Sequence, residues 1–246
     1  MEKLEEARQF LDCAFFEGEK PWDPDPLKGR YPFITISRET GAGGHELANE
    51  LIAQMRQERE LLFHGWQVFD QEIWKKILED PKLKVSVKAL MTEEYRNQLE
   101  DILFNLVERQ TPQDVVIHRI FQLLRTLASY GKVVLVGRAG ACVTRSLPSG
   151  VHVRLVASEP SRVNRMVRLL HVDEKEARRV MEEQDCSRAR LVKDYFKRDI
   201  TDPLLYDVVW NTDTVPMETI AAVIIRMIQT KALAVSGSLS GKTRLS

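Results

Sequence analysis

Short apolar segments alternate with longer amphipathic ones along most of the chain. The apolar runs have the length of strands and lie at residues 33–37, 66–70, 132–137, 151–157 and 206–211. Helical patterns follow them, at about 44–58, 71–80, 140–146, 159–198 and 216–233. Apolar strands separated by helices are typical of a parallel sheet covered on both faces. The pattern therefore predicts an α/β domain with a five-stranded parallel sheet.

Three segments depart from this alternation. Residues 2–17 have a helical pattern, and the stretch after them is rich in proline and glycine, so we expect residues 1–30 to form an extension beside the main domain. Residues 92–130 read as a long helical insertion. The tail at 234–246 is small and polar and is predicted to be disordered. The domain itself is thus expected at 31–233.

Composition narrows the class of protein. The chain has 246 residues, enough for one large domain, and its 36 basic residues balance its 36 acidic ones. This balance gives no indication of a nucleic-acid or membrane surface, and no run of ~18 apolar residues predicts a membrane span. Cys13, Cys142 and Cys186 share no metal-ligand spacing, which favours reduced thiols and a cytoplasmic protein.

The turn after the first strand is rich in glycine. A loop that binds phosphate needs backbone N–H groups at close range and a helix N-terminus directed at the anion. Both needs are met by the run Gly41, Ala42, Gly43, Gly44 and His45, which opens the first helix. The alternative is a tight turn in which glycine only relieves backbone strain.

Five blocks of sequence together resemble the cytidylate kinase-like family, relatives of the P-loop nucleoside monophosphate kinases. They are ITISRETGAGGHELANELIAQM (34–55), FDQEIW (69–74), VVLVGRAG (133–140), EEQDCSRARLVKDYF (182–196) and DPLLYDVVWNTD (202–213). The resemblance implies a three-layer P-loop fold with a helical insertion that closes over a monophosphate and a mobile lid. It also implies nucleotide ligands, ATP and CMP or a similar acceptor, with Mg²⁺.

The glycine loop departs from the usual P-loop at two positions. The alignment puts Gly44 at the usual lysine and His45 at the usual hydroxyl residue. A lost charge contact in a preorganised site costs on the order of 10² to 10³ in rate, so catalysis needs a substitute cation. Arg38 is the candidate, because a guanidinium is always charged and can bind two phosphate oxygens. The alternative for Arg38 is an ion pair with Glu39 or Glu46.

Two further strand ends carry candidate binding residues. Gly137 and Arg138 look like the family's Gly-Arg pair at the acceptor, although Val136 and Ala139 replace the acids that accompany it. Arg138 could instead cap the following turn. Asp70 closes the second strand, where it would hold a ribose hydroxyl or a Mg²⁺-bound water, or cap the next helix.

The lid-like stretch supplies the remaining candidates. Arg162, Arg165 and Arg168 recur at helical spacing, and Asp185 and Arg188 lie in the block that resembles the lid. A loose phosphoryl-transfer transition state is stabilised by arginines that arrive when a lid closes, so Arg162 and Arg188 are predicted to be catalytic, with Asp185 binding nucleotide. The alternative is a solvated helix face. Asn211 resembles the segment near the donor base.

The sequence leaves two classes of function open. One is a kinase that transfers a phosphoryl group from ATP to a pyrimidine nucleoside monophosphate such as CMP, or to another small molecule. The other is a degenerate module that senses a nucleotide and acts through a partner, which the absence of the loop lysine and hydroxyl favours. A homodimer is compatible with either.

Overall fold

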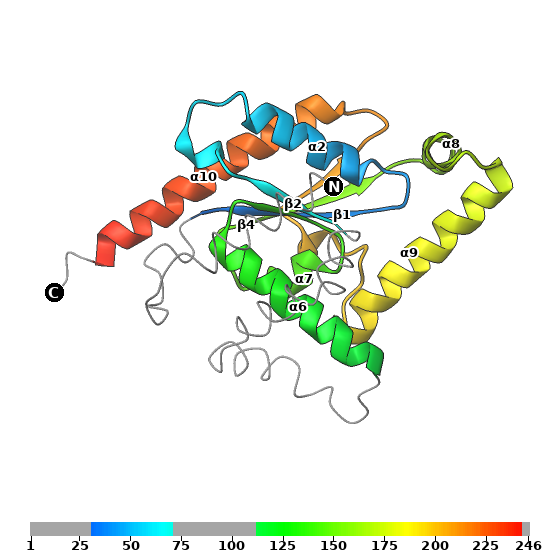
Figure 1. Ribbon diagram of the computed structural model, residues 1–246, viewed down its shortest axis with the longest axis horizontal. Coiled ribbons are helices and arrows are strands. Elements are labelled where there is room, and N and C mark those ends of the chain that lie inside the picture. Colours follow the sequence, from blue (N-terminus) through cyan, green and yellow to red (C-terminus); the bar gives the residue numbers. More distant parts are fainter. Residues whose placement is uncertain (1–30, 71–111, 243–246) are drawn as a thin grey trace, which may run out of the picture.

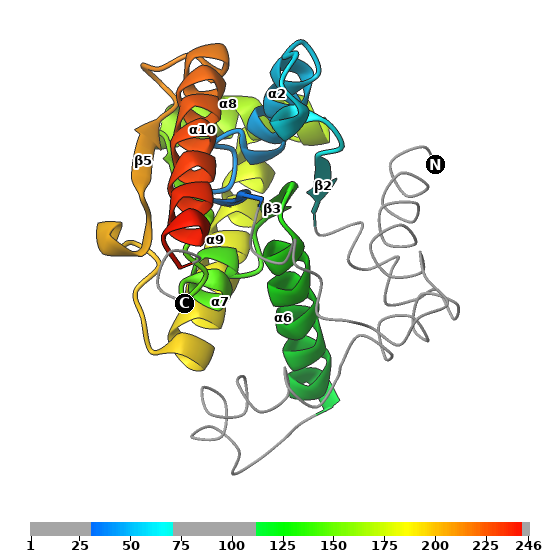
Figure 2. The same ribbon diagram turned by 90° about the vertical axis from the view of Figure 1, so that its left-hand side faces the viewer.

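The computed structural model describes residues 31–70 and 112–242 of the chain. Within them the strands form one parallel sheet in the order β2-β3-β1-β4-β5. The strands are β1 (Phe33–Arg38), β2 (Gln67–Phe69), β3 (Val133–Val136), β4 (Gly150–Val156) and β5 (Val208–Asn211). Figure 2 shows β2 and β5 at opposite sides of the sheet, which leaves β1 at its centre. The predicted five-stranded parallel sheet is confirmed.

The central strands are buried on both faces. Ile34 and Ile36 of β1 belong to the apolar core on one side of the sheet, and Phe33 belongs to the core on the other. All four residues of β3 are buried as well. Strands covered on both faces need apolar residues at consecutive positions, which is why these segments show continuous apolar runs.

Helices cover the sheet in two layers. They are α2 (Gly44–Met55), α6 (Pro112–Tyr130), α7 (Gly140–Thr144), α8 (Glu159–Leu170), α9 (Glu174–Phe196) and α10 (Met217–Lys242), with short 3₁₀ turns at Leu61–Phe63 and Pro203–Leu205. Helices α2 and α10 pack on one face of the sheet, and α6 and α7 pack on the other (Figure 1). The three-layer P-loop kinase architecture that the resemblance implied is confirmed.

The helix that follows the glycine loop is positioned by its apolar face. Leu47, Leu51 and Met55 of α2 are fully buried and lie four residues apart along the helix. They belong to the same core as Ile220 and Ile224 of α10. Burying a large apolar side chain contributes about 1.5 to 3 kcal/mol, so this packing fixes α2 and holds its N-terminus at the end of β1.

Two helical boundaries differ from the prediction. The charged stretch at 159–198 consists of two helices, because His171 adopts a left-handed backbone with φ 55° and Asp173 then caps α9 by accepting a hydrogen bond from the N–H of Glu176 at 2.8 Å. At the other end of the chain, α10 continues to Lys242, so the prediction of a disordered tail from 234 is wrong over residues 234–242. No proline interrupts the backbone hydrogen bonds there, and the early residues Ala232 to Ala234 favour helix.

Several predictions fall outside the described residues. They concern the extension at 1–30, the helix at 71–80 and the insertion up to residue 111. The end of the predicted insertion is described and forms α6. Among the described helices, none combines the length and apolar character needed to cross a bilayer.

Candidate functional site

The loop between β1 and α2, residues 39–43, turns at two glycines with left-handed backbones. Gly41 has a φ of 81° and Gly43 a φ of 88°, a region that side-chain-bearing residues seldom adopt. A Cβ at Gly41 would also lie 2.7 Å from the carbonyl oxygen of Arg162. No side chain caps α2, so its first-turn N–H groups lack the partner that an N-cap would give them. The glycines thus relieve strain and also leave a helix N-terminus without a side-chain cap, the kind of helix end that binds anions.

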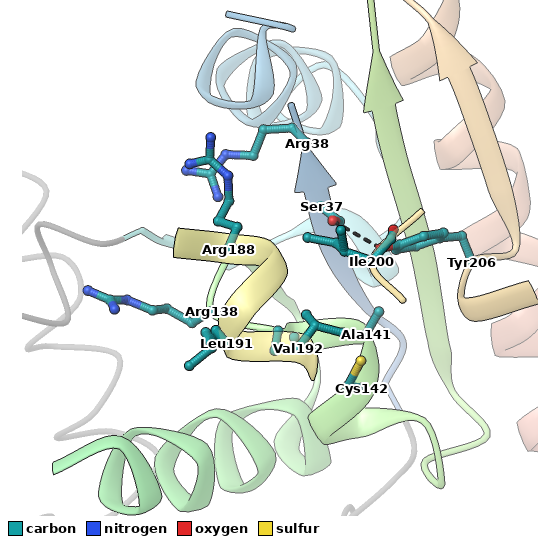
Figure 3. A pocket seen from close by; sticks show the side chains of 13 residues that line it. Ser37, Arg38, Arg138, Ala141, Cys142, Arg188, Leu191, Val192, Ile200 and Tyr206 are labelled. Carbon is teal, nitrogen blue, oxygen red and sulfur yellow. Dashed lines mark hydrogen bonds between the residues drawn. The ribbon is translucent and has the colours of Figure 1, made fainter. Parts of the chain in front are cut away.

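Arg38 extends from the end of β1 across the start of α2 to the turn after β3. A Cβ at Gly44 would lie 3.0 Å from the Cγ of Arg38, and a Cβ at Gly137 would lie 2.2 Å from its Nη1. Figure 3 shows the Arg38 guanidinium beside that of Arg188. Both glycines therefore leave the space that the arginine side chain occupies.

The Arg38 guanidinium is charged and has no direct counter-ion among the described residues. Burial and the nearby charge of Arg188 lower the pKa of Arg38 to about 10, while Asp70 raises it, so the group remains protonated at neutral pH. No hydrogen bond or ion pair joins it to another described residue. The alternative ion pair with Glu39 or Glu46 is therefore wrong, and these acids are held by other arginines.

Those other arginines come from α8 and β4. Glu39 lies 3.7 Å from Nε of Arg162 and 4.0 Å from Nη2 of Arg154. Glu46 lies 3.6 Å from Nε of Arg165, whose Nη1 donates to the carbonyl oxygen of Gly41 at 2.8 Å. The acids next to the loop are thus neutralised by residues distant in the sequence.

Asp185 of α9 joins the lid-like helices to the loop. Its Oδ1 accepts hydrogen bonds from the N–H of Thr40 at 2.8 Å and from the Thr40 hydroxyl at 2.9 Å. The same oxygen accepts from Nη2 of Arg188 at 2.6 Å, and Oδ2 accepts from Nη1 of Arg162 at 2.6 Å. Arg188 also donates to the Thr40 hydroxyl. The three lid residues singled out in the sequence therefore meet at the loop, and the solvated-face alternative does not describe them.

His45 and Asp70 lie together at the edge of the site. Nε2 of His45 is 3.6 Å from Oδ2 of Asp70, and the His45 side chain is exposed whereas that of Asp70 is largely buried. Asp70 also acts electrostatically on Arg38. The alternative role of Asp70 as a helix cap concerns residues after 70, which lie outside the described part of the chain.

The turn after β3 places Gly137 and Arg138 next to Arg38. Gly137 has a φ of 85°, and both Arg138 and Ala139 have left-handed backbones. Burial lowers the pKa of Arg138, and its Nε atom is buried without a hydrogen-bond partner. Among the described residues no hydrogen bond joins the Arg138 side chain to the turn, so it does not cap it.

The segment after β5 contacts the loop through Thr212. The Thr212 hydroxyl donates to the carbonyl oxygen of Ala42 at 3.2 Å. Asn211 is exposed, and its side-chain oxygen accepts from the N–H of Asp213 at 3.0 Å, which shapes the local turn.

A pocket lies between the ends of β1 and β3 and the side of α9 (Figure 3). Arg38, Arg138 and Arg188 supply its charge. One wall is apolar and contains Leu191, Val192 and Ile200.

The hydroxyl groups of Ser37 and Tyr206 lie in the lining of the same pocket. Tyr206 donates to the carbonyl oxygen of Ile200 at 2.9 Å, and its oxygen lies 3.2 Å from the Ser37 hydroxyl. Anionic ligands with an uncharged body fit such a combination of cations and apolar walls.

Several contact residues were not among the predicted site residues, and Arg165 and Glu39 illustrate why. Arg165 lies three residues after Arg162, and that spacing on one helix face is the signal that indicates a shared direction. Glu39 is adjacent to Arg38, but nothing in its local sequence indicates that Arg154 and Arg162 would hold it. Contacts of this kind follow from tertiary structure.

A model of the cytidylate kinase-like family matches residues 33–214. The chain belongs to this family. Among solved structures, an uncharacterized protein from Eubacterium ventriosum ATCC 27560 is similar, with a TM-score of 0.58 and 19% identity over 80% of this chain and 98% of that chain. At this identity the likeness supports the fold and no particular activity. No curated protein matches the chain.

Proposed function

We propose that this member of the cytidylate kinase-like family binds ATP through the β1–α2 loop and transfers the terminal phosphoryl group to a nucleoside monophosphate, a pyrimidine one such as CMP. The observation that supports this most is Arg38, a protonated guanidinium beside Arg188 without a counter-ion among the described residues. A buried charge without a partner is costly. A phosphate would supply the missing anion.

The positions of the arginines around the loop indicate a separate role for each in phosphoryl transfer. Arg38 would take the role of the absent loop lysine, since its guanidinium approaches the loop from the strand side. Arg162 and Arg188 already lie against Thr40 and would stabilise the charge that spreads over the transferred group. The pocket beside Arg138 would hold the acceptor, with its phosphate directed at the arginines.

Asp70 fits a supporting role toward Mg²⁺. Mg²⁺ usually retains several waters and binds one or two carboxylates together with phosphate oxygens. Asp70 directly follows β2 and acts electrostatically on Arg38, and its Oδ2 lies 3.6 Å from Nε2 of His45, whereas Asp185 and Glu39 pair with arginines. Among the described residues no group of three metal-binding side chains gathers, so the ion would arrive with the nucleotide. It would neutralise phosphate charge.

A second candidate function is nucleotide sensing without chemistry. The residue at the usual lysine position is Gly44, and a Cβ there would lie 3.0 Å from the Cγ of Arg38, so a longer side chain would displace the arginine. The acids beside the Gly-Arg pair are likewise replaced by Val136 and Ala139. In this case the nucleotide would bind and a partner would respond.

One pair of assays separates the two candidates. A coupled assay with ATP, Mg²⁺ and a panel of CMP, dCMP and UMP measures turnover, and calorimetry measures binding of the same ligands. Turnover with a pyrimidine monophosphate supports the kinase, whereas tight ATP binding with no turnover supports the sensor. If no nucleotide binds, both candidates are wrong.

The role of Arg38 is tested by Arg38→Ala. Charge-assisted hydrogen bonds contribute about 1.5 to 3 kcal/mol each, and Arg38 can form two to phosphate oxygens, so the Kd for ATP should rise at least ~100-fold. The matched control is Arg226→Ala, which removes an exposed arginine of α10 that bonds to Gln229. An Arg38→Ala protein that is folded and binds ATP as the wild type does would show that Arg38 does not replace the lysine.

A further inference from the structure

The carboxylate of Asp185 makes the contacts that a bound phosphate would make. It accepts hydrogen bonds from a loop N–H and a loop hydroxyl, both of Thr40, and from the guanidinium groups of Arg162 and Arg188. Backbone N–H groups and arginines are the donors that phosphate sites commonly use. The donors in question are therefore already paired with an anion from the chain itself.

The ion pairs of Asp185 with Arg162 and Arg188 are short and partly shielded from solvent. Both Arg–Asp185 distances are 2.6 Å, and the side chains of Asp185, Arg162 and Arg188 are each less than one-third exposed. Burial works against the charge of Asp185, but the hydrogen bonds from Arg188, Thr40 and Arg162 outweigh it and lower the pKa of the carboxyl group. Asp185 is thus ionised at neutral pH, and within the part of the chain that the structure describes the Nε atoms of both arginines have no hydrogen-bond partner, although Nε of Arg162 lies 3.7 Å from Glu39.

Arg38 differs from these two arginines. It lies beside Arg188 but makes no direct bond to Asp185. A polyphosphate that approaches Arg38 meets Arg188 next, and Nη2 of Arg188 can turn toward it only by giving up its bonds to Asp185 and Thr40.

We propose that Asp185 is an internal anion that holds Arg162 and Arg188 on the loop in the free protein and competes with the phosphates of a nucleotide for these two arginines. This inference rests on the proposed function and assigns Asp185 a role opposed to that of a nucleotide contact. The apparent affinity for nucleotide is then lowered by the fraction of molecules in which the arginines remain on Asp185. Binding energy from Arg38 offsets that cost.

Asp185→Asn tests the proposal. The asparagine has nearly the same shape and keeps an oxygen for the Thr40 donors, but it removes the charge that competes with phosphate. The control is Glu183→Gln on the same helix, which changes the net charge equally but removes a carboxylate that pairs with the exposed Arg179. The probes are ATP and inorganic tripolyphosphate, measured by calorimetry without an acceptor.

The expected result is at least a tenfold lower Kd for both probes in Asp185→Asn and a change of less than twofold in Glu183→Gln. An unchanged or higher Kd in Asp185→Asn would overturn the proposal, because Asp185 would then position the arginines instead of competing for them. If neither the wild type nor the variant binds either probe, the proposed function fails together with the inference. Wild-type binding without a gain in the variant refutes the inference alone.

A measurement on the wild type keeps the proposal testable if Asp185→Asn does not fold. The ¹³C resonance of the Asp185 carboxyl group, assigned in the labelled full chain, should shift when tripolyphosphate saturates the protein, since two guanidinium donors leave the carboxylate. A resonance that stays in place at saturation shows that the arginines remain on Asp185, which contradicts the competition.

Discussion

His152, in the middle of β4, makes the stability of the fold depend on pH. Its Nδ1 lies 2.8 Å from the Thr35 hydroxyl on β1, and the ring of Phe33 meets it edge-on at a centroid distance of 5.9 Å. The side chain is buried, and this burial lowers the pKa of His152 to about 4, although the charge of Asp207 acts in the opposite direction.

The direction of the effect follows from the two pKa values. The unfolded chain binds a proton at His152 as pH falls below 6.5, whereas the folded protein does not until pH approaches 4. The contribution of neutral His152 to stability is therefore fully present above pH 6.5 and is lost as pH falls from 6.5 toward 4. At pH 5 the difference of 1.5 pH units from 6.5 corresponds to about 2 kcal/mol at 1.36 kcal/mol per unit.

The measurement is urea unfolding at pH 8 and pH 5 of the wild type and of His152→Asn, in which asparagine keeps a polar atom near the position of Nδ1. The wild type should lose about 2 kcal/mol more than the variant between the two pH values. His64→Asn is the control, because His64 is exposed, and it should follow the wild type. If the wild type and His152→Asn lose equal stability, the buried neutral histidine is not the cause.

Two further predictions concern the loop and the cysteines. Gly41→Ala should lower the free energy of unfolding by more than ~1 kcal/mol, because its Cβ would lie 2.7 Å from the carbonyl oxygen of Arg162. The loss should exceed that of Gly65→Ala, where φ is 79° and nothing lies within 4 Å of the added Cβ. Equal urea midpoints for the two variants would contradict the contact with α8. Burial raises the pKa of the Cys142 thiol to about 11, so iodoacetamide at pH 7.5 should modify the exposed Cys186 at least ~10-fold faster, as followed by peptide mass spectrometry. Comparable rates at the two cysteines would show that the Cys142 thiol is accessible and ionised.

The sequence predicts the sheet well, because continuous apolar runs and helical spacing depend on local periodicity. Strands such as β1 and β3 are buried on both faces, and their continuous apolar runs indicate this burial. The end of α10 was predicted poorly. The end of α10 mixes alanine, which favours helix, with serine and glycine, which do not, and these opposed preferences do not decide whether a helix already packed on a core continues.

The pairings of side chains within the candidate site could not be predicted from the sequence. Arg38 was identified from its position before the glycines, but the pattern allowed an ion pair with the adjacent Glu39. Arg154 and Arg162 hold that acid, and they come from segments more than 100 residues away in the chain. Side-chain partners of this range depend on the packed structure, which local sequence does not encode.

The path of Arg38 across the loop constrains how such a protein can evolve. A lysine at position 44 would place its Cβ 3.0 Å from the Cγ of Arg38, so the arginine side chain would have to shift to admit it. The path of Arg38 also favours glycine at position 137, since a Cβ there would lie 2.2 Å from Nη1 of Arg38. Under the role proposed for Arg38, a move of the phosphate-binding cation from the strand to the helix would require coordinated changes at positions 38 and 44.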